Sequence, residues 1–231
     1  NIKELGNWKE FTCKLIWTEG HIWQTPTAIN TDLPFFQYKY VVLHKDDEPK
    51  YWESGLNRIA DVQRLSNMKR QAGLKEVLTL ELLDKWNKFC VKFNMVYPID
   101  HYGGEVFVQG LKPELNLKME QSKQPRTYIE HKYGKQMTPF TASFDFQVDE
   151  LKFEKDENGC KFFFCKYNYA VKNRELSIDK VERHAEFRSF RILDPQYYNG
   201  KFGKHSKNGF ESMFLVNGYA EKDDGNFLNP F

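Results

Sequence analysis

The residues with the most evident binding chemistry lie in one stretch, residues 35–58. It contains an indole at Trp52, an ammonium group at Lys39 and an amide at Asn57. An aromatic face can pack against the C–H face of a sugar ring, while neighbouring polar side chains fix the sugar hydroxyls. If the fold brings these three side chains to one surface, the stretch could bind a carbohydrate.

A β-hairpin is the element that would bring them together. Residues 36–42 alternate between two faces, which predicts a strand, and a polar run ending in proline predicts a turn after it. A second short strand then returns beside the first. If the turn pairs Lys45 with Lys50, the indole of Trp52 falls on the face that carries the lysine of the first strand. A slip of one residue would move the indole to the opposite face.

This stretch resembles the starch-binding module, carbohydrate-binding module family 20. The family pattern F-x-Y-K-Y stands here at residues 36–40, and W-E-x-x-x-N-R stands at residues 52–58. Upstream, residues 5–8 (LGNW) are similar to the L-G-x-W motif, and Ile22-Trp23 to the strand that precedes the hairpin. Each motif alone is short, but their succession in this order is specific.

The resemblance implies a primary α-glucan site in the first part of the chain. Trp8 and Trp52 would stack on successive glucose rings, and Lys39, Glu53 and Asn57 would hydrogen-bond the hydroxyls. For Trp8 the alternative is a ring that plugs the end of a sandwich, and the sugar platform is favoured.

Two further aromatic residues are candidates for a secondary carbohydrate contact. Trp23 could form one, although a core position is the favoured interpretation for both Trp17 and Trp23. Tyr102 matches a position that contributes to a second sugar site in some family members. An aromatic side chain that covers the core is an equally good explanation for Tyr102.

The second half of the chain repeats the pattern, which indicates tandem modules. Residues 102–110 are similar to the family's Y-G-E-x-V-x-V-x-G strand. Residues 164–169 echo F-x-Y-K-Y, and residues 181–188 echo the W-E…R segment. Residues 181–209 are also faintly similar to the starch-binding-like module of eukaryotic glycerophosphocholine phosphodiesterases.

The second copy departs from the pattern where sugar would bind. The loop tryptophan is Leu117 or is absent, and the hairpin tryptophan is Val181. If Tyr167 and Tyr169 are the paired tyrosines, Asn168 stands in place of the strand lysine. Without either ring the stacking contacts are lost, so we expect no functional primary site in this copy.

Composition excludes several classes of protein. The net charge of the 231 residues is only +2, which argues against a strongly basic nucleic-acid binder, and no apolar run approaches a membrane span. The four cysteines and six histidines lack the spacing of a metal site or a disulfide framework. Nucleotide-binding and nucleophile motifs are also absent. We therefore expect a cytoplasmic, non-enzymatic chain without metal or cofactor, which binds neither nucleic acid nor membrane.

The expected fold is all-β, with two tandem immunoglobulin-like antiparallel β-sandwiches and an extended C-terminal tail. The first module would cover residues 1–86 and be incomplete at its N-terminus, with its first strands missing. The degenerate second module would cover residues 87–193, and the tail residues 194–231.

Two functions follow from this organisation. The leading hypothesis is non-catalytic binding of an α-glucan polysaccharide, starch or glycogen, by part of a larger polypeptide or complex. The alternative is a structural or interaction subunit of a large assembly with a vestigial sugar site. Other protein chains would then bind along an open sheet edge or the C-terminal tail.

Overall fold

The computed structural model describes residues 2–73, 81–98, 104–122, 137–173, 178–182, 188–198 and 211–226. Strands dominate these residues, and the α-helix found among them, α1 (Val62–Gln71), is short. The all-β class predicted from the sequence is confirmed.

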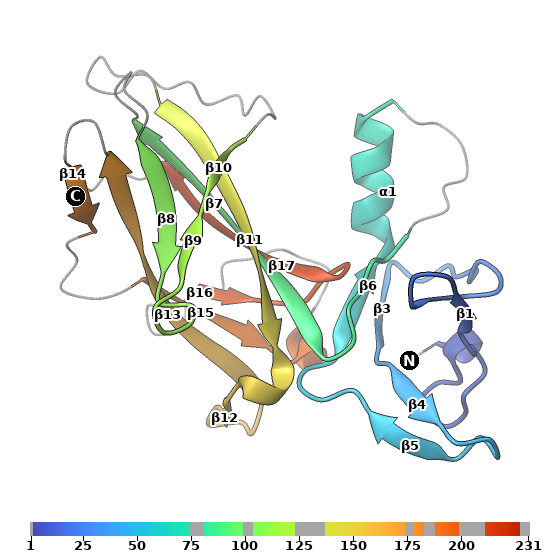
Figure 1. The fold of residues 1–231 in the computed structure, drawn as a ribbon. Coiled ribbons are helices and arrows are strands. Elements are labelled where there is room, and N and C mark those ends of the chain that lie inside the picture. Colours follow the sequence, from blue (N-terminus) through green and yellow to red (C-terminus); the bar gives the residue numbers. More distant parts are fainter. Residues whose placement is uncertain are drawn as a thin grey trace.

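The larger part of the molecule is a β-sandwich, on the left in Figure 1. One sheet has the strand order β10-β11-β7-β17, and the other has the order β16-β15-β13-β8-β9, with β12 and β14 also paired to β13. The strands are β7 (Lys88–Pro98), β8 (Glu105–Gln109), β9 (Asn116–Lys118), β10 (Glu120–Gln121), β11 (Met137–Gln147), β12 (Phe153–Lys155), β13 (Lys161–Asn173), β14 (Ile178–Val181), β15 (Arg188–Leu193), β16 (Glu211–Met213) and β17 (Tyr219–Asn226).

Strand alternation builds the core of this sandwich. In β7, every second side chain from Phe89 to Met95 is buried, and β13 opposes them with Tyr167 and Tyr169. The ring of Phe93 packs against Tyr167 at a centroid distance of 5.3 Å. Each such aliphatic or aromatic side chain contributes about 1.5–3 kcal/mol when fully buried, so the alternating pattern is sufficient to hold the two sheets together.

The N-terminal region, in blue to cyan in Figure 1, is built from small sheets. Each of its three antiparallel sheets has two strands, and its small core gathers around Ile2, Phe36, Tyr38 and Ala60. The pairs are β1 (Ile16–Thr18) with β2 (Ile22–Gln24), β3 (Phe35–Tyr38) with β6 (Arg58–Asp61), and β4 (Val41–Leu43) with β5 (Pro49–Trp52).

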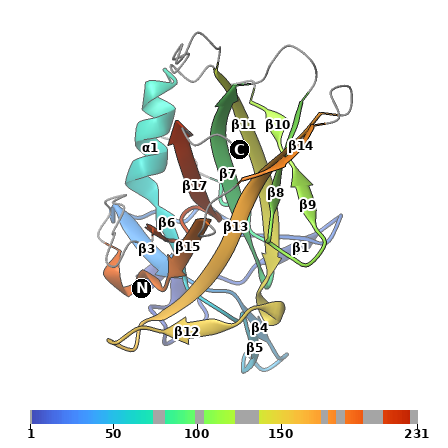
Figure 2. The ribbon, with the colours of Figure 1, turned by 90° about the vertical axis from the view of Figure 1, so that its left-hand side faces the viewer.

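Short helices complete the architecture. The 3-10 turns are η1 (Lys3–Leu5), η2 (Val148–Glu150) and η3 (Pro195–Tyr197). Helix α1 begins after Asp61, whose side chain accepts a hydrogen bond from the Arg64 backbone N–H, as an N-cap does. The helix lies beside β17 in Figures 1 and 2, and Arg64 pairs with Glu221 at 3.6 Å.

Backbone pairing joins the N-terminal region to the sandwich. The N–H of Ile59 in β6 donates to the carbonyl of Leu215 (2.9 Å), and the carbonyl of Ile59 accepts from Asn217 (2.8 Å). Ile59 is fully buried there, next to Tyr198 and Phe214. The segment before β17 therefore belongs to both parts of the molecule.

Two features differ from the sequence-based expectation. Within the predicted tail, β16 pairs in parallel with β15, and β17 pairs in parallel with the central strand β7, so these residues are integral to the sandwich. The predicted continuous strand over residues 36–42 is divided into β3 and β4, which pair with different partners. The predicted tandem organisation with its boundaries stays a prediction.

Candidate functional site

The β4–β5 hairpin presents Trp52 in a register close to the predicted one. Val41 pairs with Trp52 and Val42 with Tyr51, and an irregularity follows before Leu43. The predicted pairing of Lys45 with Lys50 would have placed Trp52 opposite Leu43, two residues beyond its observed partner Val41. A shift of two residues preserves the side-chain alternation within the hairpin, but Lys39 precedes β4, so the predicted shared face of Trp52 and Lys39 stays a prediction.

Trp52 lies beside the segment that follows Trp8. Its ring contacts Phe11 at a centroid distance of 5.9 Å, and Lys14 pairs with Asp47 in the hairpin turn at 2.5 Å. Phe11 is three residues after Trp8, so their Cα atoms are at most about 11 Å apart. Trp8 is 45% exposed and Trp52 is 47% exposed, and Phe11 links the segment after Trp8 to the hairpin that carries Trp52. Phe11 is a neighbour of the site that sequence reasoning missed.

The loop that carries Trp8 has an unusual backbone. Gly6, Asn7 and Trp8 follow one another with φ angles of 82°, 48° and 66°. A Cβ on Gly6 would lie 1.8 Å from the carbonyl oxygen of Glu10, whose N–H donates to the Gly6 carbonyl. Non-glycine residues adopt positive φ only where the surrounding structure imposes it, so this loop has a defined shape.

Lys39 and Asn57 lie toward the sandwich and are half-buried. The Lys39 ammonium donates to the carbonyl of Gly55 at 2.9 Å. Burial, together with the positive charges of Lys161 and Arg58, lowers the pKa of Lys39, and the carboxylate of Glu53 opposes this shift. The Asn57 amide donates to Gln37 at 3.4 Å. These two polar groups are thus more shielded than the two indoles.

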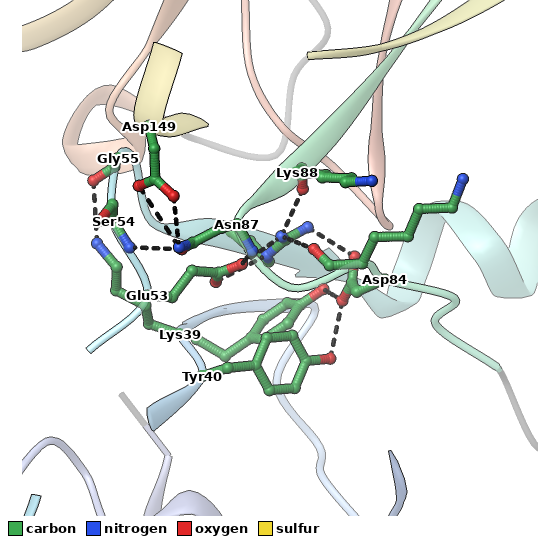
Figure 3. Close-up of polar contacts among 12 residues, drawn as sticks. Lys39, Tyr40, Glu53, Ser54, Gly55, Asp84, Asn87, Lys88 and Asp149 are labelled. Carbon is green, nitrogen blue, oxygen red and sulfur yellow. Dashed lines mark hydrogen bonds and ion pairs between the residues drawn. The ribbon is translucent and has the colours of Figure 1, made fainter. Parts of the chain in front are cut away.

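Glu53 does not have the predicted role. Its side chain is buried, with 3% of its surface exposed, and both carboxylate oxygens accept hydrogen bonds from Arg58, at 2.5 and 3.1 Å (Figure 3). The backbone N–H of Asn87 also donates to it at 3.3 Å. A carboxylate that is buried and saturated in this way cannot also bind sugar hydroxyls, so Glu53 is a positioning residue.

Arg58 extends this buried network to the junction between the two parts of the chain. It donates to Asp84 at 2.9 Å and to the carbonyls of Lys85 and Lys88. Asp84 in turn accepts from the hydroxyls of Tyr38 (2.7 Å) and Tyr40 (2.9 Å). Burial and the Asp84 carboxylate raise the pKa of Tyr38 well above its ordinary value.

An equivalent network lies in the sandwich. Arg188 pairs with Glu182 (2.8 Å) and Asp224 (3.0 Å), and Asp224 accepts from the hydroxyls of Tyr167 (2.7 Å) and Tyr169 (2.6 Å). Val181 precedes the glutamate here, as Trp52 does in the hairpin. The network thus occurs without the tryptophan that precedes the glutamate in the hairpin, which indicates a structural role. The repeated Y-x-Y, Glu and Arg spacing was the sequence signal for it.

The remaining aromatic candidates have different positions. Trp23 is 61% exposed and pairs across the β1–β2 hairpin with Trp17, which is 52% exposed. The expectation that both rings are core was wrong, because this hairpin packs neither face of its sheet against the larger core. Tyr102 lies outside the described residues.

Two other kinds of site were sought in the part of the chain that the structure describes. There, no cluster of three or more His, Cys, Asp or Glu side chains could hold a metal ion. No helix among those residues is long and apolar enough to cross a membrane.

Comparison with known proteins supports the predicted resemblance for the N-terminal region. Residues 1–72 match the family of the starch binding domain. The matched segment includes Trp8, Lys39, Trp52 and Asn57, and extends past α1. No curated protein and no solved structure matches the chain. The second copy and the similarity to glycerophosphocholine phosphodiesterases stay predictions.

Proposed function

We propose that the N-terminal region binds an α-glucan, such as starch or glycogen, without catalysing a reaction on it. The observation that supports this most is the exposure of Trp8 and Trp52 within a segment that matches the starch binding domain. Large rings are usually mostly buried when their role is only to pack, so two exposed indoles within this matched segment favour a ligand.

The polar part of the proposed site comes from Lys39 and Asn57. One ammonium N–H of Lys39 is directed to Gly55, and an ammonium group carries three donors in all. The buried Glu53–Arg58 pair holds the strand on which Trp52 is displayed. In this proposal the two indoles supply the stacking contacts, and Lys39 and Asn57 orient the sugar.

We propose a supporting role for the sandwich. It would be a degenerate second module, since Val181 stands before Glu182 where the hairpin has a tryptophan before its glutamate. Binding by a single such site would be weak, and attachment to further binding or catalytic parts of a larger polypeptide would strengthen it by avidity.

Retention on insoluble amylose and on glycogen tests the proposal. The wild type should be retained on both polymers, and the Trp8→Ala/Trp52→Ala variant should appear in the unbound fraction. Trp17→Ala is the matched control, because Trp17 is similarly exposed but lies on the β1–β2 hairpin. Equal loss in the control would indicate nonspecific adhesion through exposed rings.

A second candidate function rests on the same hairpin. Ile16, Trp17, Ile22 and Trp23 are all more than half exposed, as apolar side chains at protein interfaces are before a partner binds. If the folded wild-type chain were not retained on either glucan, a structural or interaction role would be the better explanation.

A further inference from the structure

A polar hollow lies beside the loop that carries Trp8. Its volume is about 430 Å³, within the range of roughly 300–1,000 Å³ for small-molecule sites. Residues of the η1 turn and Asn7 form one wall, and residues 30–33 form the other. Asn7, which lines the hollow, directly precedes Trp8 in the chain.

The lining has the chemistry of a site for a neutral polyhydroxyl ligand. Asn7 and Asn30 offer amide donors and acceptors, and Asp32 offers a carboxylate acceptor. Among the described residues, the side chains of these three have no hydrogen-bond partner. Leu33 lines the same hollow and is 45% exposed, which supplies an apolar surface for the C–H face of a sugar.

The charge of the hollow also favours a neutral ligand. Lys3 brings one positive charge, while Glu4 and Asp32 bring two negative ones. A polyanion would be repelled by the two carboxylates, and a simple cation would find them offset by Lys3. A sugar hydroxyl can donate to carboxylates and accept from amides, so it suits the mixed lining.

Both walls are fixed to the strand that leads to Lys39. Ile2 and Ile29 pack in the same small core as Phe36 and Tyr38 of β3. The N–H of Asn7 donates to the carbonyl of Ile2 at 2.9 Å, and the N–H of Leu33 donates to the hydroxyl of Thr31 at 3.2 Å. Both walls are therefore held in place by contacts within the protein, which lowers the entropic cost of binding a ligand there.

We propose that this hollow is an additional subsite that binds a glucose residue of the α-glucan beyond the rings stacked on Trp8 and Trp52. This inference rests on the proposed function and deepens it. Asn7, Asn30 and Asp32 hydrogen-bond the hydroxyls of that residue, and Leu33 contacts its C–H face. The subsite makes affinity depend on chain length, since only an oligosaccharide that extends past the Trp8 ring reaches it.

The test is calorimetric titration with maltotriose and with maltoheptaose. The proteins are the wild type, Asn30→Ala/Asp32→Ala, and Gln63→Ala as an exposed polar control on α1. Loss of two hydrogen bonds should weaken maltoheptaose binding by roughly 5- to 30-fold and leave maltotriose binding unchanged. The control should bind both sugars as the wild type does. Thermal unfolding of each protein verifies that the fold is kept, and Asp32→Asn replaces the double variant if that one unfolds.

Each other outcome has a distinct meaning. If both sugars bind and the double variant binds them as the wild type does, the subsite is overturned while the proposed function stands. If the folded wild type binds neither sugar, the proposed function and the subsite fall together. If the affinity of the double variant falls by the same factor for maltotriose and maltoheptaose, these residues belong to the primary site and the additional subsite is overturned.

Discussion

At the scale of single residues, the exposed Trp52 is followed directly by the buried Glu53. Arg58 binds both carboxylate oxygens of Glu53 in the interior. The resemblance implies a sugar ligand at Glu53, whereas the structure buries its side chain, and sequence alone does not show which alternate side chains are buried. Trp8 and Trp52 are exposed, and their role in sugar binding stays a prediction.

Replacement of Glu53 separates a structural role from a ligand role. Glu53→Ala should lower the free energy of unfolding by at least about 1–3 kcal/mol, because it removes one of the two carboxylates that pair with the buried Arg58 and leaves buried donors of its guanidinium unsatisfied. Glu182→Ala is the matched variant in the sandwich and should lower the free energy of unfolding by a similar amount. Urea unfolding measures both.

Glucan retention completes that comparison. We expect Glu53→Ala to weaken retention on amylose because the strand of Trp52 loosens, whereas Glu182→Ala should be retained as the wild type is. A Glu53→Ala protein with wild-type stability and no retention would contradict the structural role and restore the direct one.

Gly6 sets the shape of the Trp8 loop. Gly6→Ala should cost more than the roughly 1–2 kcal/mol of a left-handed alanine, because the added Cβ also meets the Glu10 carbonyl at 1.8 Å. Gly73→Ala is the control, since Gly73 has a similar φ of 85° but open space around it. Equal losses of stability in the two variants would contradict the close approach in this loop.

At the scale of elements, local patterns predicted the strands better than their partners. Alternation over residues 36–42 predicted strands there, and β3 and β4 lie within or beside this stretch. The pairing of β17 with β7 joins residues far apart in the sequence, and no local signal specifies such a parallel contact. The sequence therefore predicted an extended tail for residues 211–226, although the side chain of Asp224 in this stretch is only 3% exposed.

Strand β17 should make the sandwich sensitive to acid. Burial alone would raise the pKa of Asp224, but Lys222, Tyr169 and Arg188 lower it below its ordinary value of 3.8. A depressed pKa means that the carboxylate stabilises the fold above about pH 4 and that this stabilisation is lost as the pH falls further.

Urea unfolding between pH 7 and pH 3 measures this dependence. Asp224→Asn should be less stable at pH 7 and show a smaller loss on acidification than the wild type. Asp46→Asn, in the exposed hairpin turn, is the control and should follow the wild type. An Asp224→Asn protein with the full wild-type pH dependence would show that other carboxylates cause it.

At the scale of the whole molecule, the N-terminal region depends on the end of the chain. Ile59 hydrogen-bonds residues 215 and 217, and Tyr198 donates to the Asp61 carboxylate. The N-terminal region contributes only two-stranded sheets and a small core, which are marginal by themselves in water.

Truncation tests this dependence. Deletion of residues 211–231 should abolish cooperative unfolding of both parts, because β17 and the partner strand of Ile59 are removed together. Deletion of residues 227–231 leaves β17 intact and should keep the unfolding transition. A larger truncation that still unfolds cooperatively at the wild-type midpoint would mean that the two parts are independent.

Titration of maltoheptaose into wild type and Trp52→Ala tests the central claim most directly, with Trp17→Ala beside them. An indole at the centre of a binding site contributes about 2 kcal/mol or more, so Trp52→Ala should weaken binding at least roughly 30-fold. Trp17→Ala should bind as the wild type does. Wild-type affinity in the Trp52→Ala protein, or a folded wild type that binds no maltoheptaose, would contradict glucan binding at this site.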